Sequence, residues 1–269
     1  MAIVKGPFQL SGSIGNVSFY TRRDSDKVIM RTKGGVSGKK MKRLPQFEGF
    51  RNQQKEWSGC TKMASTIRYA FGGLHRLADY NLTPVLNSLT NKMQKAAIGG
   101  EKGSRPVLLS NYRQALDGFN FNRKYPFNTV LRVSVNYTMD RETLAATVNF
   151  DRINPANDLL NVQNLPYYRL IIALGMVSDM AMSEDMRDYQ ALAPEIHGIS
   201  ETVESVWFPA NSTTEALTLS AHFNEPEISA ATTQTSLLLS VAIEFGTLGI
   251  DGLPAPVKYA GCGKVLKVI

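Results

Sequence analysis

The residue types that most often carry catalysis or hold metals are scattered in this sequence. Three histidines stand far apart in the chain: His75, His197 and His222. None has a Cys, a second His or a carboxylate at the spacing that a zinc site or a general base would need. An acidic cluster at Glu184, Asp185 and Asp188 could hold a cation, although such a cluster is more commonly a solvated loop. We therefore predict no metal and no catalytic residue.

Two glycine-rich stretches are the next candidates for chemistry. Residues 99–104 (GGEKGS) superficially suggest a phosphate-binding loop, but they lack the G-x-x-x-x-G-K-[ST] arrangement and follow a helical pattern rather than a strand. Gly261-Cys262-Gly263 fits a bulge before a last strand. Cys60 and Cys262 are predicted to be reduced packing residues. These observations predict a protein that is not an enzyme and has no cofactor.

The charges are strongly polarised along the chain. Residues 1–130 hold 22 Lys/Arg and 7 Asp/Glu, whereas residues 131–269 hold 8 Lys/Arg and 16 Asp/Glu. The basic half could face nucleic acid or an acidic protein, or it could meet the acidic half of another copy. Solvated charges without a partner are the third interpretation.

The chain is predicted to begin with a basic, glycine-rich arm, residues 1–44. Segments 16–21 and 27–32 are rich in β-branched and aromatic residues, and the polar residues 22–26 between them suit a turn, so a β-hairpin is expected. An isolated two-stranded hairpin is marginal in water, so this one must pack on something. Gly34, Gly35 and Gly38 then open a flexible link to a basic cluster.

The arm supplies the residues that we predict to contact a partner. They are the side chains of the two strands, the arginines of the turn and the cations of the link: Val17, Phe19, Tyr20, Arg22, Arg23, Val28, Met30, Arg31, Lys39, Lys40, Lys42 and Arg43.

Residues 45–125 are predicted to be helical. Apolar residues recur at helical spacing from Phe47 through Phe50, Trp57 and Cys60 to Phe71, and Gly72-Gly73 ends the pattern. A second helix is expected to start with Thr83 as N-cap and Pro84 at the first position, and a short helical turn is expected within residues 110–119. The two helices should bury their apolar faces against each other.

Residues 126–269 are predicted to form an antiparallel sandwich of immunoglobulin-like type, which makes the fold class α+β. Hydrophobic and polar residues alternate in the expected strands 131–138, 144–150 and 216–223, and Pro, Asn and Gly lie between the strands. The expected strands are 131–138, 144–150, 168–176, 202–208, 216–223, 237–245 and 265–269. The connection 178–200 is acidic and Met-rich and is expected to be an exposed loop or to contain a short helix.

The stretch from Gly6 to Tyr20, GPFQLSGSIGNVSFY, resembles the opening of an uncharacterised bacterial family. Its members begin with an arm of the G-x-F-x-G-x-x-G-N-V type, continue into a helical segment and end in an immunoglobulin-like sandwich. Residues 237–245 and 259–261 also resemble the last strands of that family, whereas residues 101–127 depart from it. The family has no established activity, so the resemblance implies a fold and no catalytic residues.

These features favour a structural or assembly protein, with a phage virion or phage-tail-like particle as a setting by analogy. The arm would make repeated contacts with copies of the chain or with other structural proteins, its strands adding to a neighbour's sheet edge. Binding of nucleic acid by the same basic cluster, together with Arg51, Lys55 and Lys62, is the alternative. A hydrolase with a carboxylate pair in a cleft is a third reading.

The sequence also bears on where the chain is made. The N-terminus lacks the apolar segment of a secretory signal, and no apolar run is long enough to cross a bilayer. Synthesis in the cytoplasm is therefore expected, with incorporation in a particle as the possible destination.

Overall fold

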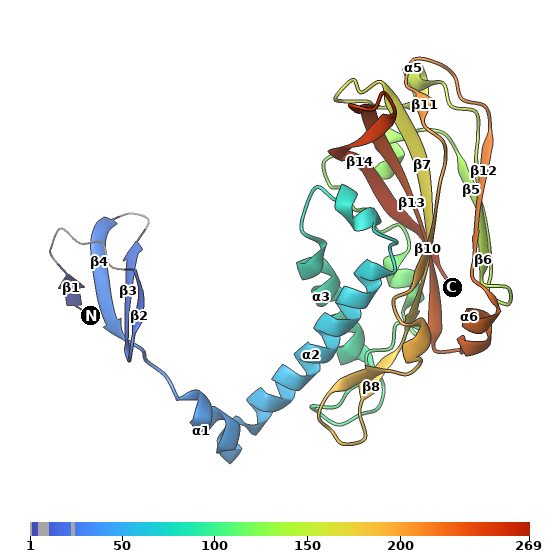
Figure 1. The fold of residues 1–269 in the computed structure, drawn as a ribbon. Coiled ribbons are helices and arrows are strands. Elements are labelled where there is room, and N and C mark those ends of the chain that lie inside the picture. Colours follow the sequence, from blue (N-terminus) through green and yellow to red (C-terminus); the bar gives the residue numbers. More distant parts are fainter. Residues whose placement is uncertain (1, 5–10, 23–24) are drawn as a thin grey trace. The chain divides into compact units, whose positions relative to one another are not determined.

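The computed structural model describes residues 2–4, 11–22 and 25–269, which form two compact units, residues 1–51 and 52–269 (Figure 1). Both units contain antiparallel sheets, and the chain also contains several helices, which agrees with the predicted α+β class. Within the described residues, no helix is both long and apolar enough to span a membrane.

The N-terminal unit is a small antiparallel sheet followed by short helical segments. Its four strands are β1 (Ala2–Val4), β2 (Gly12–Ile14), β3 (Val17–Arg22) and β4 (Ser25–Thr32), in the order β1-β4-β3-β2. The predicted β3–β4 hairpin is confirmed, with Phe19 opposite Met30 and Tyr20 opposite Ile29. Residues 34–44, expected as a flexible link, contain the helix α1 (Gly38–Arg43), and the turn η1 (Pro45–Phe47) follows.

The larger unit is built on a central sheet whose middle strands are unusually long. Its strands are β7 (Tyr167–Ser178), β10 (Ser200–Glu204), β13 (Thr235–Leu248) and β14 (Pro254–Val268), in the order β10-β7-β13-β14, and β11 (Phe208–Pro209) also pairs with β7. Residues of β7 from Leu170 to Ser178 are all buried, as are those of β13 from Thr235 to Gly246. Two layers of protein must therefore cover this sheet.

A second antiparallel sheet covers one face of the central sheet. Its strands are β5 (Val135–Asp140), β6 (Ala145–Phe150) and β12 (Leu217–His222), in the order β12-β6-β5. The inward positions predicted by alternation, such as Val148, Phe150 and Leu219, pack against Ile172, Val241 and their neighbours. The first predicted strand starts too early, because the helical turn α4 (Phe127–Val130) precedes it and pairing begins only at Val135.

Helices cover the other face, so the larger unit has three layers (Figure 1). The main ones are α2 (Glu48–Tyr69) and α3 (Leu82–Ala96), with η2 (Leu74–Leu77) and η3 (Arg113–Leu116) beside them. Their apolar side chains pack on the side of β7 and β13 that faces away from the sandwich core. The predicted pair of helices is thus confirmed, and it packs on the sheet as well.

Two details of the helix prediction are wrong. The cap of α3 is Asn81, whose side chain accepts a hydrogen bond from the Thr83 N–H at 3.0 Å, and Thr83 lies inside the first turn. Phe50 and Trp57 are exposed, although they share the apolar period of α2. The buried residues of α2 begin at Glu56 and lie mostly in its C-terminal half, because that part of the helix is the one the sheet covers.

The connection 178–200 folds as a small hairpin with a helical turn. Its strands are β8 (Met180–Met182) and β9 (Tyr189–Ala191), and η4 (Pro194–Ile196) follows. Two further short helices lie in connections, α5 (Pro155–Asp158) and α6 (Glu225–Ala230).

A close approach of backbone to backbone fixes the helix layer on the sheet. A Cβ atom at Gly175 of β7 would lie 2.0 Å from the carbonyl oxygen of Ala70, just after α2. At Gly72, whose φ is +59°, a Cβ atom would lie 2.6 Å from the Cβ of Ala173. Only glycine fits at both positions, because neither a carbonyl oxygen nor an alanine Cβ can rotate away from a clash, and the φ of Gly72 is itself unfavourable for other residues.

A buried polar network joins α2, α3, the 100–107 segment and β9. Glu56 accepts two hydrogen bonds of 2.7 Å from the Arg105 guanidinium and one of 2.9 Å from the Gly103 N–H. Gln94 accepts from the Cys60 thiol and donates to the Tyr189 hydroxyl, which itself donates to the Arg105 carbonyl. These polar groups are buried with partners, which is the condition for their burial to be tolerated.

We predict that Gly175→Val destabilises the protein by about 1–3 kcal/mol, because the new side chain overlaps the Ala70 carbonyl. The measurement is urea unfolding followed by circular dichroism. Gly49→Ala is the control, since a Cβ at that helical position meets no atom within 4 Å and alanine favours helix. Equal midpoints for Gly175→Val and the parent chain would contradict the close approach.

We predict that Glu56→Gln destabilises the protein by about 1–3 kcal/mol at pH 7, because Arg105 loses its charged partner. The hydrogen bonds from Arg105 hold the pKa of Glu56 below its usual value, and burial only partly offsets this effect. A lowered folded-state pKa contributes stability above the unfolded-state value of about 4.5, and that contribution is lost as the pH falls through the folded-state pKa.

The difference in unfolding free energy between the parent chain and Glu56→Gln should therefore shrink as the pH is lowered from 7 through this range. Denaturant titrations at a series of pH values measure it. A difference that stays constant or grows toward acid would contradict the assignment.

Candidate interaction surface

The predicted partner-binding side chains of β3 and β4 lie on both faces of the small sheet. Phe19 and Met30 are paired on one face, whereas Tyr20 lies on the other with the Arg31 guanidinium 5.5 Å from its ring centre. Val28 is 4% exposed, so it belongs to the core of the sheet, while Val17, Phe19, Tyr20 and Met30 are half-buried. Arg22 lies at the end of β3, and Arg23 lies outside the described residues.

The strand addition expected of β3 and β4 is not open to the segments that were predicted to make it. Residues 17–19 of β3 pair with both β2 and β4, and residues 28–30 of β4 pair with both β1 and β3. A strand with two neighbours has no free row of N–H and C=O groups. The edges of this sheet are instead β1 and β2.

The β2 edge is short and exposed. Gly12, Ser13 and Ile14 are all exposed, and Ile14 is 71% accessible. Gly15 (φ +57°) and Asn16 form the two-residue turn to β3, and glycine at the first turn position suits a type II′ hairpin. A Gly-Asn pair between Ile14 and Val17 is a recognised hairpin signal, so this strand was detectable in the sequence.

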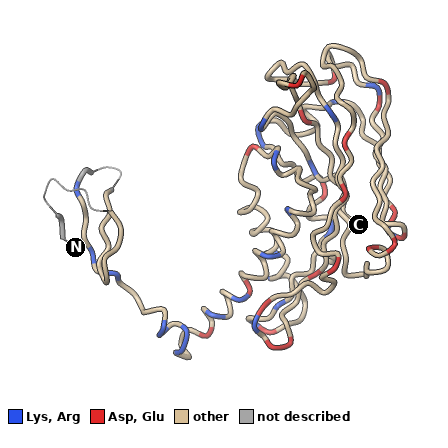
Figure 2. The backbone as a smooth tube through the Cα atoms, in the orientation of Figure 1, with Lys and Arg blue, Asp and Glu red and all other residues tan. Residues whose placement is uncertain are grey.

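The basic cluster forms α1. Lys39, Lys40, Lys42 and Arg43 are all exposed on this six-residue helix. Within the described residues, no carboxylate lies within ion-pair distance of any of the four. Figure 2 shows Lys and Arg along this unit with few Asp or Glu between them.

The geometry of α1 leaves its charges unbalanced. Lys39 and Lys42 are three residues apart, as are Lys40 and Arg43, and like charges at that spacing destabilise a helix. The Arg51 guanidinium satisfies the C-terminal end of α1 by donating to the Met41 and Leu44 carbonyls, both at 2.9 Å. A six-residue helix has little stability of its own to offset the repulsion between these cations. An anionic partner would remove that repulsion.

The other cations proposed for nucleic acid are occupied within the protein. Lys55 donates to the Met186 carbonyl at 3.1 Å, and Lys62 pairs with Asp188. Arg51 donates to the Met41 and Leu44 carbonyls.

The histidines and acidic residues considered for metal binding or acid–base chemistry lie in different parts of the structure. His222 is exposed on β12, while His75 and His197 are half-buried and burial lowers the pKa of both. Asp185 and Asp188 of the acidic cluster pair with Arg187 and Lys62. Among the described residues, no group of three metal-binding side chains comes together.

The two cysteines behave as small buried residues. Both Cys60 and Cys262 are buried and free, and burial raises the pKa of the Cys60 thiol to about 11. Burial also raises the pKa of the Cys262 thiol. Both thiols are therefore kept protonated and unreactive at neutral pH.

Comparison of the chain with protein-family models, curated proteins and solved structures finds no match. The resemblance of residues 6–20 to a bacterial family remains a prediction, and the function must be argued from the protein itself.

Proposed function

We propose that this protein is a non-enzymatic structural or assembly component that contacts neighbouring subunits through its N-terminal unit. The observation that carries the proposal is the set of four exposed cations on α1, none of which has a carboxylate of the described residues within ion-pair distance. Complementary charge speeds the encounter of two proteins and sets their register. The partner surface is therefore acidic, and residues 131–269 of another copy, with a net charge of −8, have the required sign.

The β2 edge supplies the second contact in this proposal. No described strand pairs with the outer side of β2, so its N–H and C=O groups there can pair with a strand of a neighbour, and the exposed Ile14 side chain can be buried in that contact. A contact between unlike surfaces of two copies repeats, giving rings or filaments according to whether the rotation closes. A phage virion or tail-like particle is a setting of this kind, proposed by analogy.

We also infer that the sandwich is immunoglobulin-like. Strands β5, β6, β7, β10, β12, β13 and β14 correspond in chain order to A, B, C, C′, E, F and G. The pairing β12-β6-β5 then reads E-B-A, and β10-β7-β13-β14 reads C′-C-F-G, which are the neighbour relations of that fold. Such sandwiches serve as building blocks in many unrelated proteins, so this assignment supports a structural role only by analogy.

We predict that replacing Lys39, Lys40, Lys42 and Arg43 together by glutamine weakens self-association about tenfold or more, since each exposed ion pair contributes a few tenths of a kcal/mol to 1 kcal/mol. Light scattering at low and high salt measures the association. The parent chain should form a large oligomer that dissociates in high salt, because exposed ion pairs are screened.

The charge-matched control replaces four exposed lysines of the larger unit by glutamine: Lys92, Lys95, Lys102 and Lys258. It should associate like the parent chain. A parent chain that is monomeric at both salt concentrations would overturn self-assembly. Retention on DNA that falls steeply with salt and is lost in the α1 variant would favour the nucleic-acid alternative.

We predict that Ser13→Pro blocks the strand contact while leaving the hairpin folded. In an antiparallel pair of strands, hydrogen-bonded and non-hydrogen-bonded residue pairs alternate. Ile14 and Val17 flank the two-residue turn and are hydrogen-bonded to each other, so Ser13 and Ser18 form a non-hydrogen-bonded pair. The N–H of Ser13 therefore points away from β3. Proline at position 13 then removes an N–H from the free edge only. Ser13→Val keeps the N–H and should associate normally in the same light-scattering assay, so equal association of both variants would contradict the β2 contact.

A further inference from the structure

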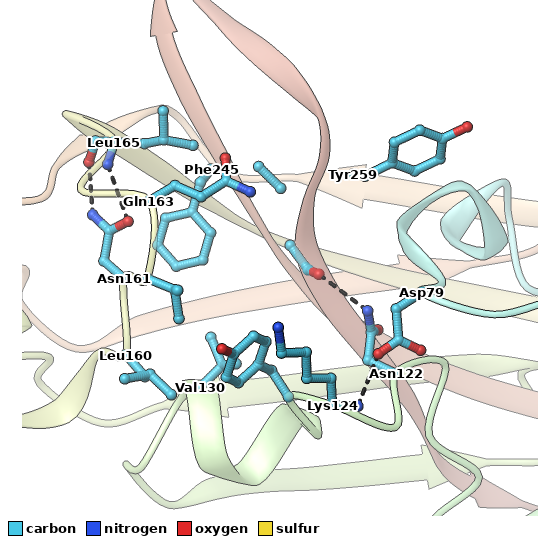
Figure 3. A pocket seen from close by; sticks show the side chains of 14 residues that line it. Asp79, Asn122, Lys124, Val130, Leu160, Asn161, Gln163, Leu165, Phe245 and Tyr259 are labelled. Carbon is cyan, nitrogen blue, oxygen red and sulfur yellow. Dashed lines mark hydrogen bonds between the residues drawn. The ribbon is translucent and has the colours of Figure 1, made fainter.

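A pocket of about 300 Å³ opens at one end of the larger unit, between segments far apart in the sequence (Figure 3). The 122–125 and 160–165 segments form two of its sides, and β13 and β14 contribute residues Phe245 and 259–261. Ligand pockets span about 300–1,000 Å³, so this one suits a single small molecule.

One part of the pocket is apolar. Phe245, Val130 and Ala260 are buried there, and Leu160 and Leu165 are half-buried beside them. The loop that carries the two leucines is held rigidly, because the Asn161 side chain donates to the Leu165 carbonyl at 2.7 Å and accepts from the Leu165 N–H at 3.0 Å. The concave apolar surface is therefore formed before any ligand binds.

The other part carries two opposite charges, Asp79 and Lys124, and backbone N–H groups fix the position of the Asp79 carboxylate. Asp79 accepts hydrogen bonds from the Arg123 N–H and from the Lys124 N–H, the latter at 2.8 Å. These contacts leave room on the carboxylate for one further donor, since it has about four acceptor positions. The buried Asn122 side chain anchors the same loop by donating to the Leu77 and Gly261 carbonyls.

The Lys124 ammonium is available to a ligand. It points into the space between the apolar side chains and Asp79 in Figure 3. The ammonium lies 5.3 Å from the centre of the Tyr125 ring, and none of the described carboxylates lies within ion-pair distance of it.

Tyr259 at the margin of the pocket is held in an unfavourable backbone conformation. Its φ is +61°, in the left-handed region that an aromatic residue rarely adopts, and its side chain is 64% exposed. Between the pairs Glu244–Gly261 and Gly246–Pro256, residues 257–260 of β14 lie opposite Phe245 alone, so β14 bulges at Tyr259. Bulges of this kind redirect side chains and are over-represented beside active sites.

We propose that this pocket binds a free α-amino acid with an aromatic or branched aliphatic side chain. The ligand carboxylate would pair with Lys124, its ammonium would donate to Asp79, and its side chain would pack on Phe245, Val130 and Leu165. A purely anionic ligand would face the Asp79 carboxylate, and a purely cationic one would face Lys124. A ligand without charges would displace water from the Asp79 carboxylate and the Lys124 ammonium without replacing the lost hydrogen bonds, which costs binding free energy.

The test is an NMR titration of the full-length chain with three probes that share a phenyl group. L-Phenylalanine carries both charges, 3-phenylpropionate only the carboxylate, and 2-phenylethylamine only the ammonium. L-Phenylalanine should bind about fivefold or more tightly than either of the others, with shifts at Lys124, Tyr259 and Gln163, since one exposed ion pair is worth about that factor. Equal affinities for the three probes, or no shifts at these residues at millimolar concentration, would overturn the proposal.

A variant pair separates the role of Lys124 from a general charge effect. Lys124→Met should weaken L-phenylalanine and 3-phenylpropionate about fivefold each and leave 2-phenylethylamine unchanged or improved. Lys92→Met removes an exposed lysine of α3 and should change none of the three affinities. If both variants behave alike, the pocket is not the site. The same titration is run on the chain with Lys39, Lys40, Lys42 and Arg43 replaced by glutamine, so that signal lost through self-association is not mistaken for absence of binding. The outcome is then separate from the proposed assembly role.

Discussion

The fold of the larger unit depends on one sheet that is buried on both faces. Successive side chains of β7 point to opposite faces of the sheet. Ile172 packs in the core shared with the second sheet, and Ile171 packs in the core shared with the helices. Because the strand backbone is paired within the sheet, its polar groups need no water. Burial of apolar surface on both sides then supplies most of the driving force, at roughly 25 cal/mol per Å².

Double burial has a consequence for charged groups, which must be paired wherever the helix layer meets the sheet. Glu244 of β13 is 2% exposed and accepts hydrogen bonds from Arg76 of η2 and from Arg169 of β7. Arg169 also pairs with Glu204 and stacks on Trp207, 4.7 Å from its ring centre. Because a buried ion that loses its partner is costly, these contacts penalise any other register of helices on the sheet.

The N-terminal unit has the opposite character. In its small sheet, the buried hydrophobic side chains include Val28 and Ile29 of β4, while β2 and α1 are exposed. A sheet of this size stabilises itself weakly, and the repulsion within α1 adds to its cost. These two properties are the reason for proposing an acidic partner surface for this unit.

The sequence by itself determined the β3–β4 hairpin, the presence of α2 and α3, the inward residues of β6 and β12, and the charge polarity, because each is a local pattern of residue types. Tertiary structure alone decided which strands are inner, why Trp57 is exposed and which loops enclose the pocket. Those features depend on pairing between distant segments. β3 has no free edge because β2 folds back on it. Asp79 lies beside Lys124 because it accepts a hydrogen bond from the Lys124 N–H, 45 residues later in the sequence. Periodicity reports which face of an element is apolar; it does not report what covers that face.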